Sequence, residues 1–313
     1  MSSMAQTEVQ ELVFGDTRVT RVIESAGNLY MTPSQFFPDS EPAMWEKPGV
    51  WNEPEFLIPA GESVHEHTHR VAFQTWVIRS AGKVILVDTG VGNDKERPYV
   101  PLWSHLNGDF LDRLAAAGVR PEDVDVVVNT HIHPDHTGWN TVLRDRVWTP
   151  TFPNATYYLT TEDLEFWNPA NGHQTVLGPG AQNMWEDSVA PILDAGQVKQ
   201  WSGTERIDEN LLLEAAPGHT PGSSILRLTS GGEEVLFIGD ILHTPLQVGE
   251  PAVNSCFCQD PQLAAETRRR VFTEAAAKGT LMFPAHFTGK GAFTVRADGD
   301  AFALAGWAPL VSA

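Results

Sequence analysis

Short runs of apolar residues, or of alternating apolar and polar residues, recur through the first half of the chain and are bounded by glycine and aspartate. Such runs of about four to eight residues are typical of β-strands. A longer segment with apolar residues at helical spacing, residues 106–117, ends at Gly118 and predicts an α-helix. The predicted strands of this half are residues 17–24, 73–79, 83–88 and 124–129.

The second half of the chain repeats this order of strands and helices, although no sequence repeat is recognisable. Helices are predicted to start at residue 161 and to span 261–278, and residues 168–185 form a polar, glycine-containing excursion. Two rounds of strands followed by a helix indicate an α/β protein with four layers, an αβ/βα sandwich, and we expect residues 1–313 to form a single domain. The predicted strands of this half are residues 155–159, 211–216, 224–228, 234–239 and 281–284.

An aromatic-rich N-terminal insertion, at about residues 28–70, interrupts this scheme. It is rich in proline and has too little periodicity to predict a helix or a strand. An ordered insertion of this length is typically a binding loop or a lid, and aromatic packing on the outside of the core is the alternative. We expect residues 28–51 to cover or border the reactive cleft. The aromatic residues in the insertion are Tyr30, Phe36, Phe37, Trp45, Trp51 and Phe56.

The charge of the chain limits its partners. Forty acidic residues against 21 basic ones give a formal charge of −19, and this field repels phosphate backbones and anionic membrane surfaces. We therefore expect no nucleic-acid partner. No membrane partner is expected either, because no segment approaches the ~18 consecutive apolar residues of a membrane span. The expected partner is a small-molecule substrate, and a homodimer is a candidate assembly.

The N-terminal residues and the cysteines favour a cytoplasmic protein. The first ten residues lack the basic region and apolar stretch of a signal peptide. The two cysteines of the chain, Cys256 and Cys258, are too close in sequence for an unstrained structural disulfide on an extended chain. We expect both to be reduced thiols without a metal role, because no other cysteine could complete a site.

Four side chains that can bind a metal ion occur within residues 131–136, directly after the predicted strand 124–129. A loop in this position can turn several side chains toward one point. Imidazole and carboxylate groups suit zinc and related metals, so the segment predicts a metal site, and a solvated histidine-rich loop is the alternative. The four residues are His131, His133, Asp135 and His136.

The pattern His-x-His-x-Asp-His after a strand resembles the signature of metallo-β-lactamase-fold hydrolases. Four further segments match the motifs of that family in the same order, and together the matches cover about two thirds of the chain. These segments are Asp88-Thr89-Gly90, Gly218-His219-Thr220-Pro221-Gly222, Gly239-Asp240 and Ala285-His286.

The resemblance implies two bound metal ions. The first would be held by His131, His133 and His219, and the second by Asp135, His136 and His286, with Asp240 bridging both. Two divalent ions about 3.5–4 Å apart can hold a hydroxide between them and polarise a carbonyl or phosphoryl oxygen as Lewis acids. Zinc is the expected metal, with manganese, cobalt or iron as alternatives. We expect Asp135 and Asp240 to take part in catalysis, and Asp88 to orient a ligating histidine.

The ligand types exclude some relatives. Flavodiiron oxidases carry glutamate where this chain has His133, and β-lactamases proper lack the bridging carboxylate that the resemblance implies for Asp240. His243 lies three residues after Asp240, near where acyl-homoserine lactonases place a tyrosine that contacts the substrate carbonyl. We expect a catalytic, substrate-facing role for His243, and a histidine satisfied within the core is the alternative.

The resemblance is closest to methyl parathion hydrolase and the quorum-quenching lactonase-like group. It implies a binuclear hydrolase of ester-like substrates, either a lactone or a carboxylic ester, with organophosphate triesters as a third class. A glutathione thioesterase similar to glyoxalase II, or a mono-iron persulfide dioxygenase, is the alternative enzyme. A non-catalytic metal-binding sensor is a weaker alternative, because the ligand set is complete.

Two clusters lie outside the family motifs. His65, His67 and His69 alternate along the chain, and we interpret them as part of a solvated loop without chemistry. The consecutive arginines 268–270 fan around the axis of a predicted helix, so we predict that they lie on a solvated face and form no binding pocket for glutathione carboxylates.

Overall fold

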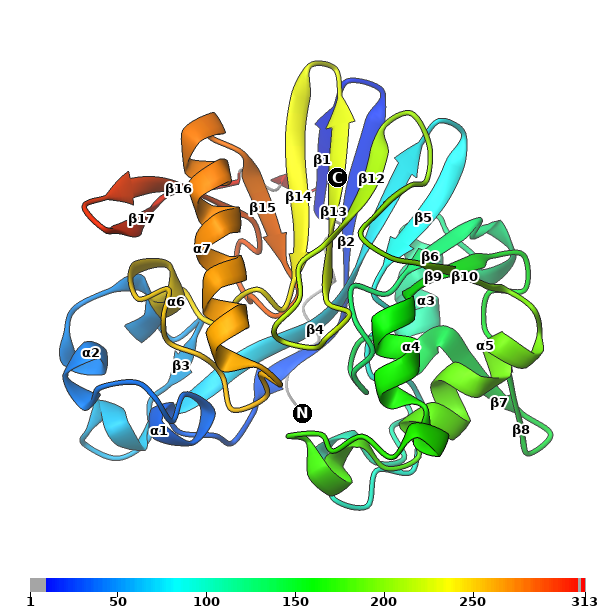
Figure 1. Cartoon of the computed structure of the whole chain (residues 1–313), viewed down its shortest axis with the longest axis horizontal. Helices are drawn as coiled ribbons and strands as arrows, with labels where there is room; N and C mark the ends of the chain where they lie inside the picture. Colours follow the sequence, from blue (N-terminus) through cyan, green and yellow to red (C-terminus); the bar gives the residue numbers. More distant parts are fainter. Residues whose placement is uncertain (1–9, 309–310, 313) are drawn as a thin grey trace.

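Two β-sheets packed face to face form the centre of the computed structural model, which describes residues 10–308 and 311–312 (Figure 1). The expectation of no signal peptide concerns mainly residues 1–9, which lie outside the described residues. The first sheet has the strand order β10-β9-β6-β5-β4-β2-β1-β18, and β3 pairs with β4. Its strands are β1 (Gln10–Phe14), β2 (Thr17–Asn28), β3 (Leu57–Ile58), β4 (Thr68–Ser80), β5 (Lys83–Val87), β6 (Val126–Val128), β9 (Thr156–Thr160), β10 (Val198–Trp201) and β18 (Val311–Ser312).

The second sheet follows the order of the chain, β11-β12-β13-β14-β15-β16-β17. Its pairs are antiparallel except for β14 and β15, which run parallel with Phe237 opposite Phe283. The strands are β11 (Thr204–Arg206), β12 (Leu211–Ala215), β13 (Ser224–Ser230), β14 (Glu233–Gly239), β15 (Leu281–Pro284), β16 (Phe293–Asp298) and β17 (Ala301–Trp307), and a separate hairpin pairs β7 (Thr141–Arg144) with β8 (Val147–Pro150).

Helices cover the outer faces of both sheets (Figure 1). The longest, α7, begins with Asp260 capping the amide of Leu263 and ends at Gly279 in the left-handed conformation. It packs against the second sheet, whereas α3, α4 and α5 cover the first. No helix of the described residues is long and apolar enough to cross a membrane. The helices are α1 (Pro33–Phe36), α2 (Pro42–Glu46), α3 (Phe110–Ala116), α4 (Thr161–Trp167), α5 (Ala190–Asp194), α6 (Leu246–Gly249) and α7 (Pro261–Lys278).

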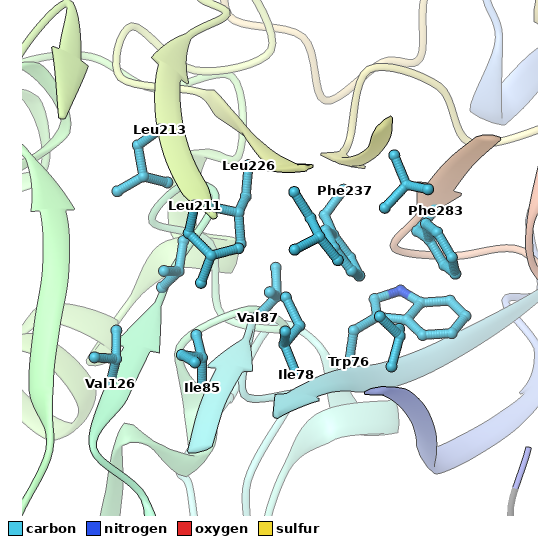
Figure 2. Packing of buried hydrophobic residues seen from close by; sticks show 14 of the residues in the cluster. Trp76, Ile78, Ile85, Val87, Val126, Leu211, Leu213, Leu226, Phe237 and Phe283 are labelled. Carbon is cyan, nitrogen blue, oxygen red and sulfur yellow. The ribbon is translucent and has the colours of Figure 1, made fainter. Parts of the chain in front are cut away.

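The space between the sheets is filled by alternating side chains of both inner faces, as Figure 2 shows. Trp76 of β4 packs edge-on against Phe283 of β15, with ring centroids 4.8 Å apart, and Phe283 stacks on Phe237 of β14. The neighbouring Ile85 and Leu213 belong to the same buried cluster. The predicted four-layer α/β sandwich is therefore confirmed.

Several boundaries differ from the sequence prediction. The helix predicted at residues 106–117 begins only at Phe110, and the strand predicted at 124–129 keeps three residues. The hairpin of β7 and β8 and the strands β16 and β17 were not predicted. Their isolated apolar positions become recognisable as strands only once the partner strand is known, because packing across the ladder decides strand formation.

The insertion at residues 28–70 has more regular structure than its sequence indicated. It forms α1, α2 and β3, and its last residues begin the long strand β4. Phe36, Phe37 and Trp45 are buried in a cluster of their own beside the sandwich. The short helices lack a periodic pattern because each is about one turn long.

His69 corrects the prediction of a solvated loop for the histidines at positions 65, 67 and 69. It lies in β4, is only 2% exposed, and is surrounded by the rings of Phe36, Phe37 and Trp45 at centroid distances of 5.0–5.3 Å. Burial lowers its pKa to about 3, so the ring is neutral at physiological pH. His65, by contrast, contacts the Glu46 carboxylate at 3.0 Å near the surface.

Candidate metal centre

All predicted ligands lie in loops that follow the carboxyl ends of strands. Asp88 follows β5, residues 131–136 follow β6, and His219 lies in the loop after β12. Asp240 and His286 come directly after β14 and β15, which are parallel neighbours, as are β5 and β6. β12 runs in the same direction as β14, because both are antiparallel to β13. Strands that run in the same direction end at the same edge of a sheet, so two loops of the first sheet and three of the second converge at one edge of the sandwich.

The first ligand set has the spacing of a metal coordination shell. His131 Nε2 lies 3.1 Å from His133 Nδ1, which lies 3.0 Å from His219 Nε2. His219 Nε2 is in turn 3.2 Å from Asp240 Oδ2. A tetrahedral zinc shell with bonds of about 2.0 Å has edges of about 3.3 Å between ligand atoms. These side chains can therefore hold a metal ion.

The second ligand set shares Asp240 with the first. His136 Nε2 lies 3.2 Å from His286 Nε2, and Asp135 Oδ2 lies 3.6 Å from the same His286 atom. Asp240 Oδ1 lies 3.1 Å from His286 Nε2 and 3.5 Å from His136 Nε2, both in this set. Its Oδ2 lies between the sets, 3.2 Å from His219 Nε2 in the first and 3.2 Å from His286 Nε2 in the second. Oδ1 is buried and has no hydrogen-bond partner among the described residues. A carboxylate placed in this way is suited to bridging two ions.

The remaining ring nitrogens of four of the five histidines are held by neighbours, which fixes the orientation of these imidazoles. Asp88, whose backbone is in the left-handed region with φ of 56°, reaches His136 and also accepts from the Thr130 amide at 2.7 Å. The orienting contacts of the Nδ1 atoms are His131 to Thr130 Oγ1 at 3.1 Å, His136 to Asp88 Oδ2 at 3.0 Å, His286 to the Ala72 carbonyl at 3.0 Å and His219 to Cys258 Sγ at 3.6 Å.

Burial and neighbouring charges shift the pKa values of the cluster in opposite directions. Burial, with repulsion from adjacent imidazoles, lowers the pKa of His131 and of His133 well below the usual value. Burial also opposes a charge on His136, but the carboxylates of Asp240 and Asp88 outweigh it and raise its pKa well above the usual value. Burial likewise opposes a charge on His219, but contacts with Asp240 and Cys258 raise its pKa to about 9. Because metal binding requires neutral imidazole, ion uptake would displace protons from both sets.

His243 lies beside both ligand sets. Its Nε2 is 3.0 Å from Asp240 Oδ2, and its ring stacks on His286 at 5.6 Å with an interplanar angle of 14°. Burial lowers its pKa to about 4. With Asp240 and His286 it forms a further group whose ligand atoms could hold an ion. The structure thus places His243 beside both ligand sets, and its substrate-facing role stays a prediction.

Two residues that support the centre were missed in the sequence analysis. Cys258 is a buried free thiol against His219, and no motif connects the two positions. Arg268 was predicted to be solvated but is fully buried, which is a correction. Its guanidinium donates to the carbonyls of Ile241, Pro251 and Val253 at 2.6–2.9 Å, so it holds the loop that follows Asp240 and carries His243. Only the tertiary structure reveals this role.

A cavity of about 940 Å³ lies over the ligand sets. His133, Asp135, His219, Asp240, His243 and His286 line its floor. Its walls are largely apolar, and among the described residues no lysine or arginine lines it. Phe36 of the insertion faces the cavity, as predicted for this segment, whereas Phe37 and Trp45 pack behind it. The other aromatic wall residues are Tyr30, Phe73, Tyr99, Trp103 and Phe257.

The chain belongs to the metallo-beta-lactamase superfamily, which it matches over residues 74–286. This match includes every predicted ligand from His131 to His286. The fold and the convergence of the ligand loops at one edge of the sandwich agree with this assignment.

Relatives of this chain include hydrolases with small substrates. The N-acyl homoserine lactonase AttM of Azorhizobium caulinodans is 29% identical over 149 residues, which are 45% of this chain and about half (49%) of the length of that relative. Among solved structures, the hydrolase AbOPH superimposes with a TM-score of 0.77 at 22% identity, covering 96% of this chain and 97% of that one. The dizinc quorum-quenching lactonase AidC gives 0.76 at 19% identity with the same coverage. These structures share the fold.

Proposed function

We propose that this chain is a binuclear metal-dependent hydrolase of uncharged ester-like substrates, a lactone or a carboxylic ester, with organophosphate triesters as a further class that the same cleft could take. The observation that carries the proposal is Asp240, whose two oxygens face two complete ligand sets at the floor of an apolar cavity. Two divalent ions, for which zinc is the proposed identity, would supply an activated water and polarise the scissile group.

The residues of the chain would orient the substrate and move protons. Asp135 lines the cavity floor and is the most accessible carboxylate of the ligand sets, so it can pass a proton toward the leaving group. The neutral ring of His243 holds Asp240 from one side and faces the cavity, where it can contact the substrate carbonyl. The named relatives support this assignment, since AttM and AidC are lactonases.

The composition of the cavity wall favours a neutral substrate. A glutathione thioester carries two carboxylates, which would enter a site whose described lining contains no lysine or arginine. The apolar character continues to the mouth, where Tyr30, Tyr99, Leu102 and Val176 are exposed by 42–71%. The segments 29–31, 99–103 and 176–180 that carry them contain no charged residue. An acyl or aryl group fits this surface better than a tripeptide does.

The test is a hydrolysis panel on zinc-loaded protein with an N-acyl homoserine lactone, an aryl ester, a phosphotriester and S-lactoylglutathione. We expect turnover of at least one neutral substrate, roughly two zinc ions per chain, and loss of activity with a chelator. Turnover of S-lactoylglutathione alone would refute the proposed substrate class, and one iron per chain without hydrolysis would favour the dioxygenase.

A matched pair of variants tests the role of the mouth. Val176→Ser removes an exposed apolar side chain at the mouth, and Val147→Ser removes one on the distant hairpin of β7 and β8. We expect only the first variant to lower kcat/KM for long-chain substrates, by roughly tenfold, which is about 1.4 kcal/mol. Equal kcat/KM values for the two variants would mean that the mouth of the cavity does not contribute to substrate binding.

A further inference from the structure

Asp163 connects two ligand loops without touching a ligand. It is fully buried in the first turn of α4, where Oδ2 accepts from the Ile132 amide at 2.8 Å and from the Thr220 hydroxyl at 2.9 Å. Its Oδ1 accepts from the Gly222 amide at 2.6 Å. Neither the ligand motifs nor the spacing of the chain marked this residue.

The partners of Asp163 are the immediate neighbours of the first ligand set. Ile132 lies between His131 and His133, and Thr220 follows His219. The two loops extend from different sheets, one after β6 and the other after β12. The carboxylate therefore fixes the separation between loops whose ligand atoms, His133 Nδ1 and His219 Nε2, must stay 3.0 Å apart.

The start of α4 and the second of these loops are in direct contact. The Thr160 hydroxyl, at the N-cap of α4, donates to the Gly222 carbonyl at 2.9 Å. A Cβ atom at position 222 would overlap Thr160 Oγ1 and crowd the amide of Asp163, so only glycine allows this approach. The first turn of α4 therefore packs directly against this loop, and Gly222 is bound twice, through its carbonyl by Thr160 and through its amide by Asp163.

The second ligand set has other supports. His136 is oriented by Asp88 and His286 by the Ala72 carbonyl, and neither of these groups contacts Asp163. We propose that Asp163 is the positioning residue of the first metal set, and that it determines the metal affinity of this set and leaves that of the second unchanged. The inference rests on the proposed two-metal function.

The substitution Asp163→Asn isolates this role. The asparagine side chain has the same size, but one of its two acceptor oxygens is replaced by an NH2 group. That NH2 group would face donors, either the Gly222 amide or the Ile132 amide and the Thr220 hydroxyl, so the corresponding hydrogen bonds are lost. The loop separation is then no longer fixed, and loss of such a supporting contact typically weakens metal binding about 10–100-fold. Glu162→Gln, on the exposed side of the same helical turn, is the control for loss of one carboxylate charge.

The measurement is zinc affinity by chelator competition in two backgrounds. His286→Ala disables the second set, and in this background we expect Asp163→Asn to weaken zinc binding about 10–100-fold. His219→Ala disables the first set, and there Asp163→Asn should have no effect. Glu162→Gln should change neither affinity. Unchanged affinity in the first background, or equal losses in both, would overturn the proposal, because equal losses indicate general destabilisation.

Two additions keep the test decisive. If Asp163→Asn does not fold, Thr220→Val removes only one of the three hydrogen bonds, and it should cause a smaller loss of affinity confined to the His286→Ala background. The metal-free melting temperature of each variant reports the fold separately. Failure of the proposed function would show as absence of hydrolysis by the zinc-loaded wild type, whereas this inference fails only in the zinc titration.

Discussion

Replacing Asp240 with asparagine tests the centre most directly. In the structure its Oδ2 lies 3.2 Å from His219 Nε2 in the first set, and its Oδ1 lies 3.1 Å from His286 Nε2 in the second. Asn has the same shape but only one carbonyl oxygen. One of the two sets would therefore face an NH2 group, which cannot bind a cation, and both sets would lose the shared negative charge.

The expected effect on catalysis is large because activation of the water requires both ions. With one ion weakly held, the bound water is less acidic and the scissile group less polarised. A loss of about 4 kcal/mol of transition-state stabilisation corresponds to roughly a thousandfold lower kcat. The fold should suffer less, since the core between the sheets does not include Asp240.

The assay measures zinc content, melting temperature and kcat on the best substrate of the panel. Asp194→Asn, at the exposed end of α5, is the control for an Asp-to-Asn change away from the centre. We expect about one zinc ion per chain for Asp240→Asn and an unchanged value for the control. If Asp240→Asn retained two zinc ions and near-normal turnover, Asp240 would not be the bridge, and the proposed two-metal mechanism would be wrong.

Two further predictions concern stability. Burial lowers the pKa of His69 to about 3, against 6.5 for an exposed imidazole. Between pH 6.5 and pH 3 the imidazole is therefore protonated in the unfolded chain and neutral in the folded one, so the free energy of unfolding decreases as the pH falls through this range. His69→Phe should remove this dependence, which is worth about 2 kcal/mol at pH 5. Urea denaturation of the wild type and the variant at pH 7 and pH 5 measures it, and an equal loss of stability between the two pH values in both proteins would contradict the reasoning. Arg268→Met should destabilise the fold by about 3–5 kcal/mol, because the buried carbonyls of Ile241 and Pro251 lose the guanidinium donor, while that of Val253 keeps only its hydrogen bond from Gln247. Arg269→Met, on the exposed side of α7, should cost under about 0.5 kcal/mol. Similar losses for both variants in thermal denaturation would mean that the buried Arg268 contributes little to stability.

The ligand loops were predictable from sequence because each is a local pattern. Residues 131–136 bring four ligands together within one loop, and glycine or aspartate marks the strand ends at Asp88 and Asp240. The order of these motifs along the chain then matched that of a known family. The central strands of both sheets and the helix α7 were predictable for the same reason, since periodicity over several residues reports the buried face, whereas β7, β8, β16 and β17 were not.

The supporting residues were not predictable, because their roles depend on contacts between distant segments. Asp163 meets residues 31 and 57–59 positions away, and Cys258 meets His219 across 39 positions. The run of arginines at 268–270 looked uniform, yet one of them is buried and the others face solvent. A helix turns by about 100° per residue, so consecutive identical residues sample different environments, and only the packing partner distinguishes them.

The charge of the whole chain and that of the centre act in opposite directions. The net charge of −19 repels anions in bulk, and no lysine or arginine of the described residues lines the cavity to reverse that effect. Two divalent ions would exceed the charge of the carboxylates of Asp135 and Asp240, so the loaded floor would be the positive group in an apolar cavity. A neutral ester could enter this cavity without the free-energy cost of desolvating a charge. The negative charge that develops on its oxygen during attack would lie beside the ions. Under the proposed function, the apolar wall and the acidic surface would therefore select against anionic substrates, and the metal-loaded floor would stabilise the anion that the reaction creates.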